Sequence, residues 1–116
     1  MKYMLAIYGN KEKWDSFTPE EFGPIIAETD ALNRALLASG EMIGAYGVAD
    51  ASEAITVRMV DGVPAVTDGP YIEAKECLGS FSILEVDSLE RAIEIASLNP
   101  ASRYGAVELV ELPHHA

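Results

Sequence analysis

"FTPEEFGPIIAETDALNRALLASG" (Phe17–Gly40) decides the fold, because it predicts one long helix. Thr18 and Glu21 form a capping box, and Pro19 occupies the first helical position, where its missing N–H costs nothing. Gly40 is a typical residue at the end of a helix. Between these signals, side chains recur on one face at three- and four-residue spacing: Phe22, Ile25, Ile26, Thr29, Leu32 and Leu36. The segment therefore predicts an amphipathic helix.

A strand is predicted on each side of this helix. Lys2–Gly9 (KYMLAIYG) is short, rich in aromatic residues and closed by a glycine and an asparagine. Both of its faces are fairly apolar, as a central strand covered on both sides requires. Glu41–Val48 (EMIGAYGV) is predicted to be a second strand, which its two glycines weaken. The first half of the chain is thus predicted to be β-α-β.

A hairpin is predicted next, over residues 54–67 (AITVRMVDGVPAVT). Apolar and polar side chains alternate along its first half, and Asp61-Gly62 supplies a tight turn. Pro64 cannot donate a hydrogen bond to a neighbouring strand, so the returning strand is expected at a sheet edge.

The second half of the chain repeats the β-α-β order. Gly79–Val86 (GSFSILEV) predicts a strong strand, and residues 87–100 (DSLERAIEIASLNP) predict a helix. We expect Asp87 to be the cap of this helix, Glu90 to complete a second capping box and Pro100 to end it. Residues 105–112 (GAVELVEL) predict the last strand, and residues 68–78 a loop.

This order of elements predicts an α+β fold of the ferredoxin-like split βαβ type with an inserted β-hairpin. Both helices then cover one face of the sheet and leave the other face open. Because several strands are apolar on both sides, the open face would expose more apolar surface than a monomer normally tolerates. We therefore expect a homodimer in which two sheets pair face to face and bury more than about 1,200 Å² in total.

Size and charge restrict the possible functions. The 116 residues, 49% of them hydrophobic, suit a single domain over residues 1–116 with one core. The net charge of −11 opposes binding to nucleic acid or to an anionic membrane. No N-terminal signal is recognisable, and no apolar run approaches the roughly 20 residues of a membrane span. The single cysteine, Cys77, fits a reducing compartment, so the expected location is cytoplasmic.

The loop after the hairpin holds most of the candidate site residues. Asp68-Gly69-Pro70 predicts a stiff turn, because Asp can bond the backbone two residues on, Gly allows a positive φ and Pro restricts the exit. One interpretation is structural only. In the other, the turn aims Asp68 and Tyr71 into a cleft at a strand end. We then expect Asp68 to cap its own turn and the loop to form one wall of the main pocket.

Charged residues follow in the same loop. Glu73, Lys75 and Glu76 are either a solvated segment or a ligand-facing group in which Lys75 lies between carboxylates. Asp68 with Glu73 and Glu76 offers oxygen ligands for a metal, but no histidine joins them and their spacing matches no metal-binding loop. We therefore expect no metal and no cofactor.

Residues outside this loop give weaker signals. Tyr46 and Tyr104 stand beside glycines at strand ends, where they either pack inside the protein or reach a cleft. Cys77 is expected to be a buried, unreactive thiol. His114 and His115 lie at the end of the chain, where we expect them to be loose.

Over nearly its whole length the chain resembles the DGPF family, a branch of the YciI-like proteins. Three stretches carry the resemblance: KYMLAIYG at residues 2–9, DGPYIEAKECLGSF at residues 68–81 and NPASRYGAVELVEL at residues 99–112. The central stretch matches the motif D-G-P-aromatic-x-E-x-K-E-x-L-G, with Tyr71 in place of the usual Phe. The resemblance implies a ferredoxin-like fold that dimerises in the α/β-barrel manner.

The resemblance also bears on catalysis and partners. Some YciI-like proteins carry a His–Asp pair proposed as an acid–base site, with the His early in the first helix and the Asp in an Asp-Pro before the last strand. This chain has no histidine before His114, and it has Asn99-Pro100 where the Asp-Pro would stand, so this pair is absent. DGPF relatives are often encoded beside, or fused to, extracytoplasmic-function sigma factors, which implies an accessory or sensing role by association.

Three hypotheses for function follow. The first is a homodimeric YciI-like domain that binds a small molecule or acts as an accessory protein, with these ligand-binding residues: Tyr46, Gly69, Pro70, Tyr71, Lys75 and Glu76. The second is a cofactor-independent lyase or isomerase with Asp68 or Glu73 as base and Tyr104 or Tyr46 as proton donor. The third is an interaction protein for a sigma factor, because the charge of −11 suits a basic partner.

Overall fold

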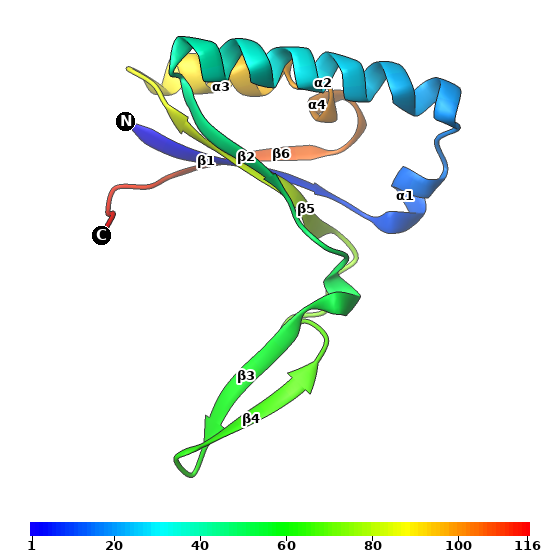
Figure 1. Cartoon of the computed structure of the whole chain (residues 1–116), viewed down its shortest axis with the longest axis vertical. Coiled ribbons are helices and arrows are strands. Elements are labelled where there is room, and N and C mark those ends of the chain that lie inside the picture. The colour runs from blue at the N-terminus through cyan, green and yellow to red at the C-terminus, as the bar shows by residue number, and fades with distance from the viewer.

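Four strands form the main sheet in the computed structural model, which describes residues 1–116 (Figure 1). The strands are β1 (Lys2–Gly9), β2 (Met42–Gly47), β5 (Cys77–Glu85) and β6 (Ala106–Glu111). Their order across the sheet is β2-β5-β1-β6, and all neighbours are antiparallel. The protein is therefore α+β, and the strand order is consistent with the expected ferredoxin-like fold.

Two helices lie over one face of this sheet (Figure 1). α2 (Pro19–Ser39) begins at Thr18, whose Oγ1 accepts from the N–H of Glu21 at 3.2 Å, while Glu21 Oε1 accepts from the N–H of Thr18 at 3.0 Å. These two bonds confirm the predicted capping box. The helix ends at Gly40, whose φ of 82° is a left-handed conformation that glycine adopts without strain. No helix of the protein has the combination of length and hydropathy that crossing a membrane requires.

The start of α3 (Leu89–Leu98) corrects one prediction. Its cap is Ser88, whose Oγ accepts from the N–H of Arg91 at 3.1 Å, and not Asp87. The N–H of Val86 still donates to the carbonyl of Met1, directly before the neighbouring strand β1. Asp87 therefore lies in the turn between β5 and the helix cap. Because the helix begins one residue later than predicted, the second capping box with Glu90 does not form.

Two short helices were not predicted. α1 (Lys11–Asp15) is capped by Asn10, whose Oδ1 accepts from the N–H of Lys13 at 2.7 Å and whose Nδ2 donates to Glu76 at 3.2 Å. α4 (Ala101–Tyr104) follows directly after Pro100, the predicted end of α3. Each is about one turn long, which is too short for a helical period of apolar residues to be recognised.

The core lies between the helices and the main sheet. It consists of eight buried side chains drawn from both halves of the chain: Tyr3, Leu5, Leu36, Met42, Leu84, Val86, Ala92 and Ile95. At its edge, Arg91 of α3 binds Glu41, which precedes β2, through two hydrogen bonds of 2.7 and 2.9 Å. This ion pair ties the second β-α-β half to the first.

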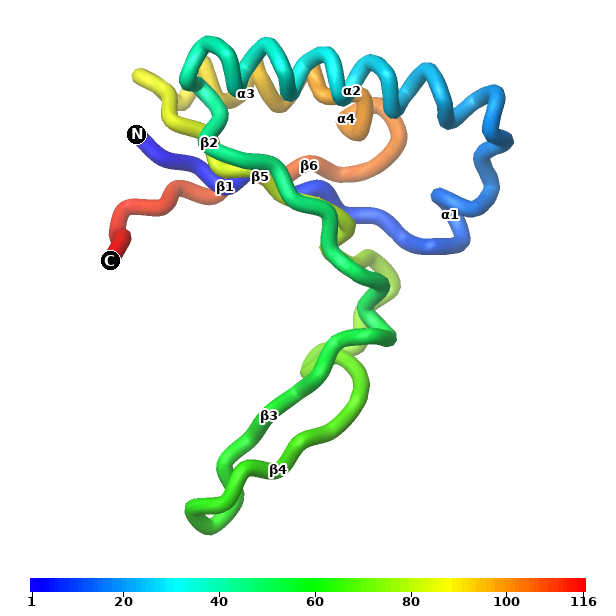
Figure 2. The backbone as a smooth tube through the Cα atoms, in the orientation of Figure 1, coloured from blue at the N-terminus to red at the C-terminus, as the bar shows by residue number.

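The predicted hairpin is present as a separate two-stranded sheet, β3 (Ile55–Val60) and β4 (Val63–Asp68). Val60 and Val63 are paired, so Asp61-Gly62 is a two-residue turn, with φ values of 51° and 77°. Positive φ at both positions defines a type I′ turn, as the Asp-Gly dipeptide predicts. The hairpin leaves the ends of β2 and β5, with a short 3-10 turn η1 (Ala51–Glu53) before it, and descends away from the helices (Figure 2).

The second face of the main sheet is uncovered. On it, Tyr46 of β2 is 54% exposed and its ring lies 5.3 Å from that of Phe81 on β5. The register places Met4 beside both Ile83 and Val110, and Val110 is 40% exposed. Only 14 of the 116 residues are buried, so much apolar surface of this chain lies in water. Pairing of two such faces stays a prediction.

Candidate functional site

The loop between β4 and β5 is tied to the base of the hairpin. Gly69, with a φ of 101°, donates its N–H to the carbonyl of Ala54 at 2.7 Å, and its own carbonyl accepts from Thr56 Oγ1 at 2.8 Å. The Asp68 carboxylate is exposed and accepts no hydrogen bond, so the prediction that Asp68 caps its own turn is wrong. Asp68 is still paired with Ile55 as the last residue of β4, and the chain reverses one residue later.

Several predicted site residues of this loop lie in water. Tyr71 is 72% exposed, and the guanidinium of Arg58 lies 5.7 Å from its ring centre. Glu73 and Lys75 are exposed and form no ion pair. The structure therefore does not hold Lys75 between carboxylates.

A hollow of about 480 Å³ lies between this loop and η1. Pro70 and Glu76, both predicted to bind a ligand, line it together with the half-buried Cys77. The loop thus forms a wall of this hollow; that the hollow is the main pocket of the domain stays a prediction. Asp68 and Glu73, the two candidate bases, are not among the lining residues.

A second cavity, of about 380 Å³, lies beneath the N-terminal half of α2. Phe22, Ile25 and Ile26 of α2 line it, opposite Ile7 of β1 and beside Ala101 of α4. The apolar stripe of α2, predicted from its three- and four-residue spacing, does not face the core along its whole length. Its C-terminal half faces the core, whereas its first turns face this cavity.

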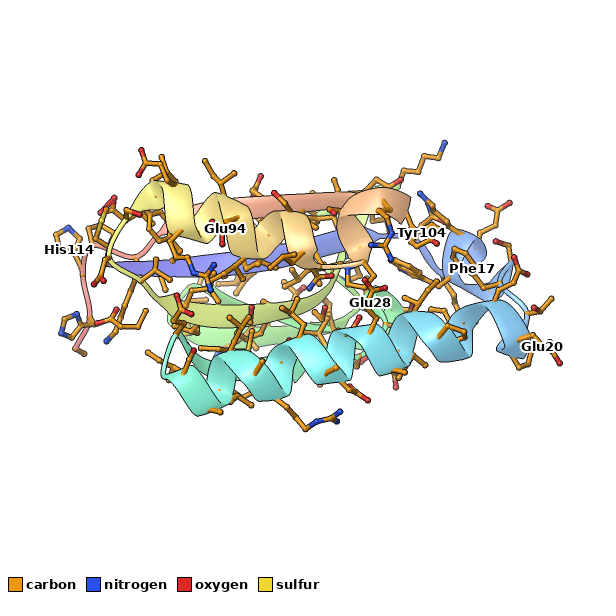
Figure 3. The ribbon with its side chains drawn as sticks, turned by 90° about the horizontal axis from the view of Figure 1, so that it is seen from above. Phe17, Glu20, Glu28, Glu94, Tyr104 and His114 are labelled. Atoms are coloured by element: carbon orange, nitrogen blue, oxygen red, sulfur yellow. The ribbon has the colours of Figure 1, made fainter.

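Aromatic rings close one end of this second cavity. Trp14 of α1 and Phe22 of α2 both line it, with their ring centres 6.3 Å apart. Phe17 lies 6.2 Å from Trp14 and meets the ring of Tyr104 edge-on at 5.4 Å (Figure 3). Gly9 makes room for this arrangement, because a Cβ atom there would lie 2.5 Å from Trp14 Nε1.

Asn99 supplies a buried polar group to the same cavity. Its side chain is almost fully buried, and its Oδ1 accepts from the N–H of Ala101 at 2.9 Å. Because that N–H can only donate, it determines the orientation of the amide. Nδ2 donates no hydrogen bond within the chain. Every side-chain nitrogen or oxygen that is fully buried has a partner, so Nδ2 is not fully buried. Nδ2 must therefore reach open space, and the cavity is the space that Asn99 lines.

Other polar groups stand around the cavity. Ser80, Asp30 and the predicted Tyr104 are among its lining residues. Beside it, Arg103 of α4 and Glu28 of α2 form an ion pair at 2.7 Å between Nη2 and Oε2, and the hydrogen bond from Arg103 lowers the pKa of Glu28 (Figure 3). Both side chains of the pair are about half exposed, so its contribution to stability is small.

The second cavity was largely missed by sequence reasoning. Tyr104 is the one predicted site residue that lines it, whereas Tyr46 lies on the open sheet face. Asn99 attracts attention in the sequence only as the replacement of an aspartate, and Trp14 carries no signal because α1 is so short. An apolar helical stripe looks the same whether it faces a core or an apolar cavity.

The lining of this cavity is mainly apolar. Its lining includes no histidine, and both His114 and His115 are exposed at the end of the chain. No three His, Cys, Asp or Glu side chains converge in a way that could hold a metal ion. Apolar walls with one unpaired amide N–H suit a small, mainly apolar molecule that carries a hydrogen-bond acceptor.

Comparison with known proteins bears on the whole chain. A family model described as "YCII-related domain" matches residues 1–114. An uncharacterized protein of Rhizobium meliloti (strain 1021) is 26% identical over 96 residues, which span 83% of this chain and 77% of that protein. The family match agrees with the resemblance that the three sequence stretches carry.

Proposed function

This chain belongs to the YCII-related domain family, and we propose that it is a single-domain homodimer that binds a small, mainly apolar molecule in the cavity beneath α2. The observation that carries this proposal is the unpaired Nδ2 of the buried Asn99. Nδ2 is accessible from the cavity, so water can pair with it in the free protein. A ligand that displaces this water must bring its own acceptor, because a donor left unpaired in the bound complex would cost about 1–3 kcal/mol.

The walls of the cavity indicate the class of ligand. Its volume of about 380 Å³ lies within the usual range for small-molecule sites, roughly 300–1,000 Å³. The rings of Trp14 and Phe22 favour an aromatic or other flat apolar group. Asp30 at the cavity and the net charge of −11 disfavour an anion. A neutral aromatic molecule with a carbonyl oxygen meets all of these conditions.

Binding is best tested with a matched pair of probes, acetophenone and ethylbenzene, which have similar shape and differ in a carbonyl acceptor. The chain has one tryptophan, so the indole N–H signal of Trp14 in a ¹H–¹⁵N spectrum is a single resonance that reports on this cavity and on the surface hollow beside it, which Trp14 also lines. We expect both probes to shift it, and acetophenone to bind at least about 3-fold more tightly because it pairs with Asn99 Nδ2.

Asn99→Asp is the informative variant, because the carboxylate keeps an acceptor for the N–H of Ala101 but loses the donor. It should abolish the preference for acetophenone. Asn33→Asp makes the same chemical change on α2 at a residue that does not line the cavity, and it should keep the preference. The proposal is wrong if neither probe shifts the Trp14 signal, or if Asn99→Asp discriminates between the probes as the wild type does.

The dimer is supported by the uncovered face of the main sheet. Tyr46, Phe81 and Val110 present apolar surface there, and the rest of the chain leaves it in water. Light scattering at micromolar concentration should give twice the mass of the 12.5 kDa chain. A monomer mass would refute this part of the proposal and leave the ligand cavity, which one chain forms alone, untouched.

The other hypotheses stay predictions. A base in the loop needs a desolvated carboxylate, whereas Asp68 and Glu73 are exposed. The ligand contacts predicted for Pro70 and Glu76 would belong to the hollow beside η1 rather than to the cavity beneath α2, and Gly69 lines neither. A sigma-factor partner and a cytoplasmic location rest on the net charge, the resemblance and the single cysteine.

A further inference from the structure

The hairpin carries an apolar face that its own chain leaves in water. Val57 and Val66 are a cross-strand pair, and they are 61% and 63% exposed. Ile55 and Met59 lie two residues to either side of Val57, and therefore on the same face of the strand. They are 66% and 65% exposed, and Pro64 is the cross-strand partner of Met59. These five residues are called the arm face below.

The opposite face of the hairpin is more polar below its tip. Thr56 pairs with Thr67 across the strands, and Arg58 pairs with Ala65. Arg58 extends toward the ring of Tyr71, 5.7 Å from its centre. The hairpin is thus amphipathic, and an isolated two-stranded hairpin is only marginally stable in water unless its apolar face packs on something.

The chain itself does not cover the arm face. No strand of the main sheet pairs with β3 or β4. At the base of the hairpin, the hydrogen bonds of Gly69 with Ala54 and Thr56 join the two ends of the ribbon to each other rather than to the body. The hairpin is therefore held away from the body of its own chain (Figure 1).

The surface area indicates how much is left uncovered. The chain exposes 7832 Å², whereas a compact monomer of 12.5 kDa exposes about 6,200 Å². Its radius of gyration is 16.4 Å, whereas a compact domain of this length has about 13 Å. The excess of about 1,600 Å² is larger than the roughly 800 Å² that each partner contributes to a stable interface.

The position of the hairpin points to the same partner as the open sheet face. It lies on the side of the main sheet that the helices leave uncovered (Figures 1 and 2). It also springs from the ends of β2 and β5, the strands that carry Tyr46 and Phe81. A second copy seated on the open sheet face would lie alongside the arm face, so one partner can cover both apolar surfaces.

Charge selects a second copy over a charged protein partner. Two copies that each carry −11 can meet only through surfaces with few carboxylates. The arm face is such a surface, since Asp68 beside Ile55 at its base is the one charged residue on that side of the ribbon. Arg58, the only cation of the hairpin, lies on the opposite side and offers no attraction to an acidic partner at the arm face.

We propose that the arm face of each copy packs against the body of a second copy, so that two hairpins clasp the dimer reciprocally. The contact is isologous, as expected for a twofold dimer, in which each copy gives one arm and receives one. This inference rests on the homodimer proposed above and names the segment that holds it together.

Photocrosslinking tests the contact directly. p-Benzoylphenylalanine is placed at position 57 on the arm face or, as a control, at position 58 on the opposite face, and equal amounts of ¹⁵N-labelled and unlabelled protein are mixed. Irradiation should give a covalent dimer that contains one chain of each kind from the position 57 probe, and little or none from the position 58 probe.

A pair of substitutions on β4 tests the energetics. Val66→Asp puts a carboxylate on the arm face, whereas Thr67→Asp puts one on the opposite face of the next residue. Val66→Asp should raise the dissociation constant of the dimer at least about 30-fold, because the carboxylate would be buried unpaired. Thr67→Asp should raise it less than about 3-fold, as surface substitutions do. Sedimentation over a dilution series measures both.

The outcomes separate the clasp from the dimer. If the wild type is a dimer but position 57 gives only cross-links within one chain, or Val66→Asp dimerises like the wild type, the clasp is wrong and the dimer stands. If the wild type sediments as a monomer at micromolar concentration, both are wrong. An interchain cross-link from position 57 together with weakened dimerisation of Val66→Asp supports the clasp.

Discussion

Asn99 serves the fold and the cavity at once. Its Oδ1 accepts from the N–H of Ala101 at the start of α4, and its Nδ2 has no partner within the chain. An aspartate, which the resemblance implies at this position, would offer acceptors only. Asparagine offers a donor as well as an acceptor, and this donor supports the binding function proposed for the cavity.

Gly62 allows a prediction at the scale of the residue. It is the second residue of the type I′ turn, with a φ of 77°. Gly62→Val should reduce the free energy of hairpin opening by roughly 1–3 kcal/mol, because a β-branched residue resists positive φ. Gly62→Asn should cost much less, since Asn tolerates the left-handed region. Hydrogen exchange of the Val60 and Val63 amides measures the opening, and equal protection in the two variants would contradict the argument.

At the scale of the element, the residue at which a helix starts depends on the hydrogen bonds that the preceding backbone makes. Asp87 and Ser88 are both good caps by residue type. The hydrogen bond of the Val86 N–H to Met1 extends the sheet by one residue and leaves the cap to Ser88. A local motif identifies that a helix starts here, and a contact with the other end of the chain shifts the start by one residue.

Ser88 and Asp87 therefore differ in what their replacement costs. Ser88→Ala should lower the free energy of unfolding by about 1 kcal/mol, because the N–H of Arg91 loses its acceptor. Asp87→Ala should cost clearly less, since the Asp87 side chain makes no hydrogen bond. Urea denaturation of both variants measures the difference. A larger loss for Asp87→Ala would mean that Asp87 is the cap in solution.

At the scale of the whole molecule, few contacts join the two β-α-β halves apart from the shared sheet and core. The Arg91–Glu41 pair is one of them, and its side chains are about one-third exposed. The hydrogen bond from Arg91 lowers the pKa of Glu41. The folded protein therefore holds the ionised carboxylate more strongly than the unfolded chain does.

This linkage predicts a loss of stability in acid. Because the pKa of Glu41 is lower in the folded state, its stabilising effect is complete above the unfolded pKa of about 4.3 and is lost as the pH falls below it. Unfolding measured between about pH 3 and 6 should show a shallower decrease in Glu41→Gln than in the wild type. Glu73→Gln removes a carboxylate that forms no ion pair and should follow the wild-type curve. Identical slopes in all three proteins would show that the pair does not link folding to pH.

The sequence by itself determined the features that depend on neighbouring residues. The capping box at Thr18, the tight turn at Asp61-Gly62 and the strand Lys2–Gly9 each involve a few consecutive positions, and the structure confirms them. Their order along the chain then restricted the topology to the split βαβ sheet, because connections of this kind have few solutions.

Only the tertiary structure decided where the cavity lies and which residues line it. Trp14 of α1, Ile25 of α2 and Asn99 at the end of α3 come from three separate elements, and they line one cavity beneath the N-terminal half of α2. The tertiary structure also leaves the side chains of Asp68 and Glu73 exposed to water. A cavity exists where surfaces from distant segments approach without filling the space between them. Local sequence patterns predict which side of an element is apolar, but they do not predict how closely the neighbouring elements pack against that side.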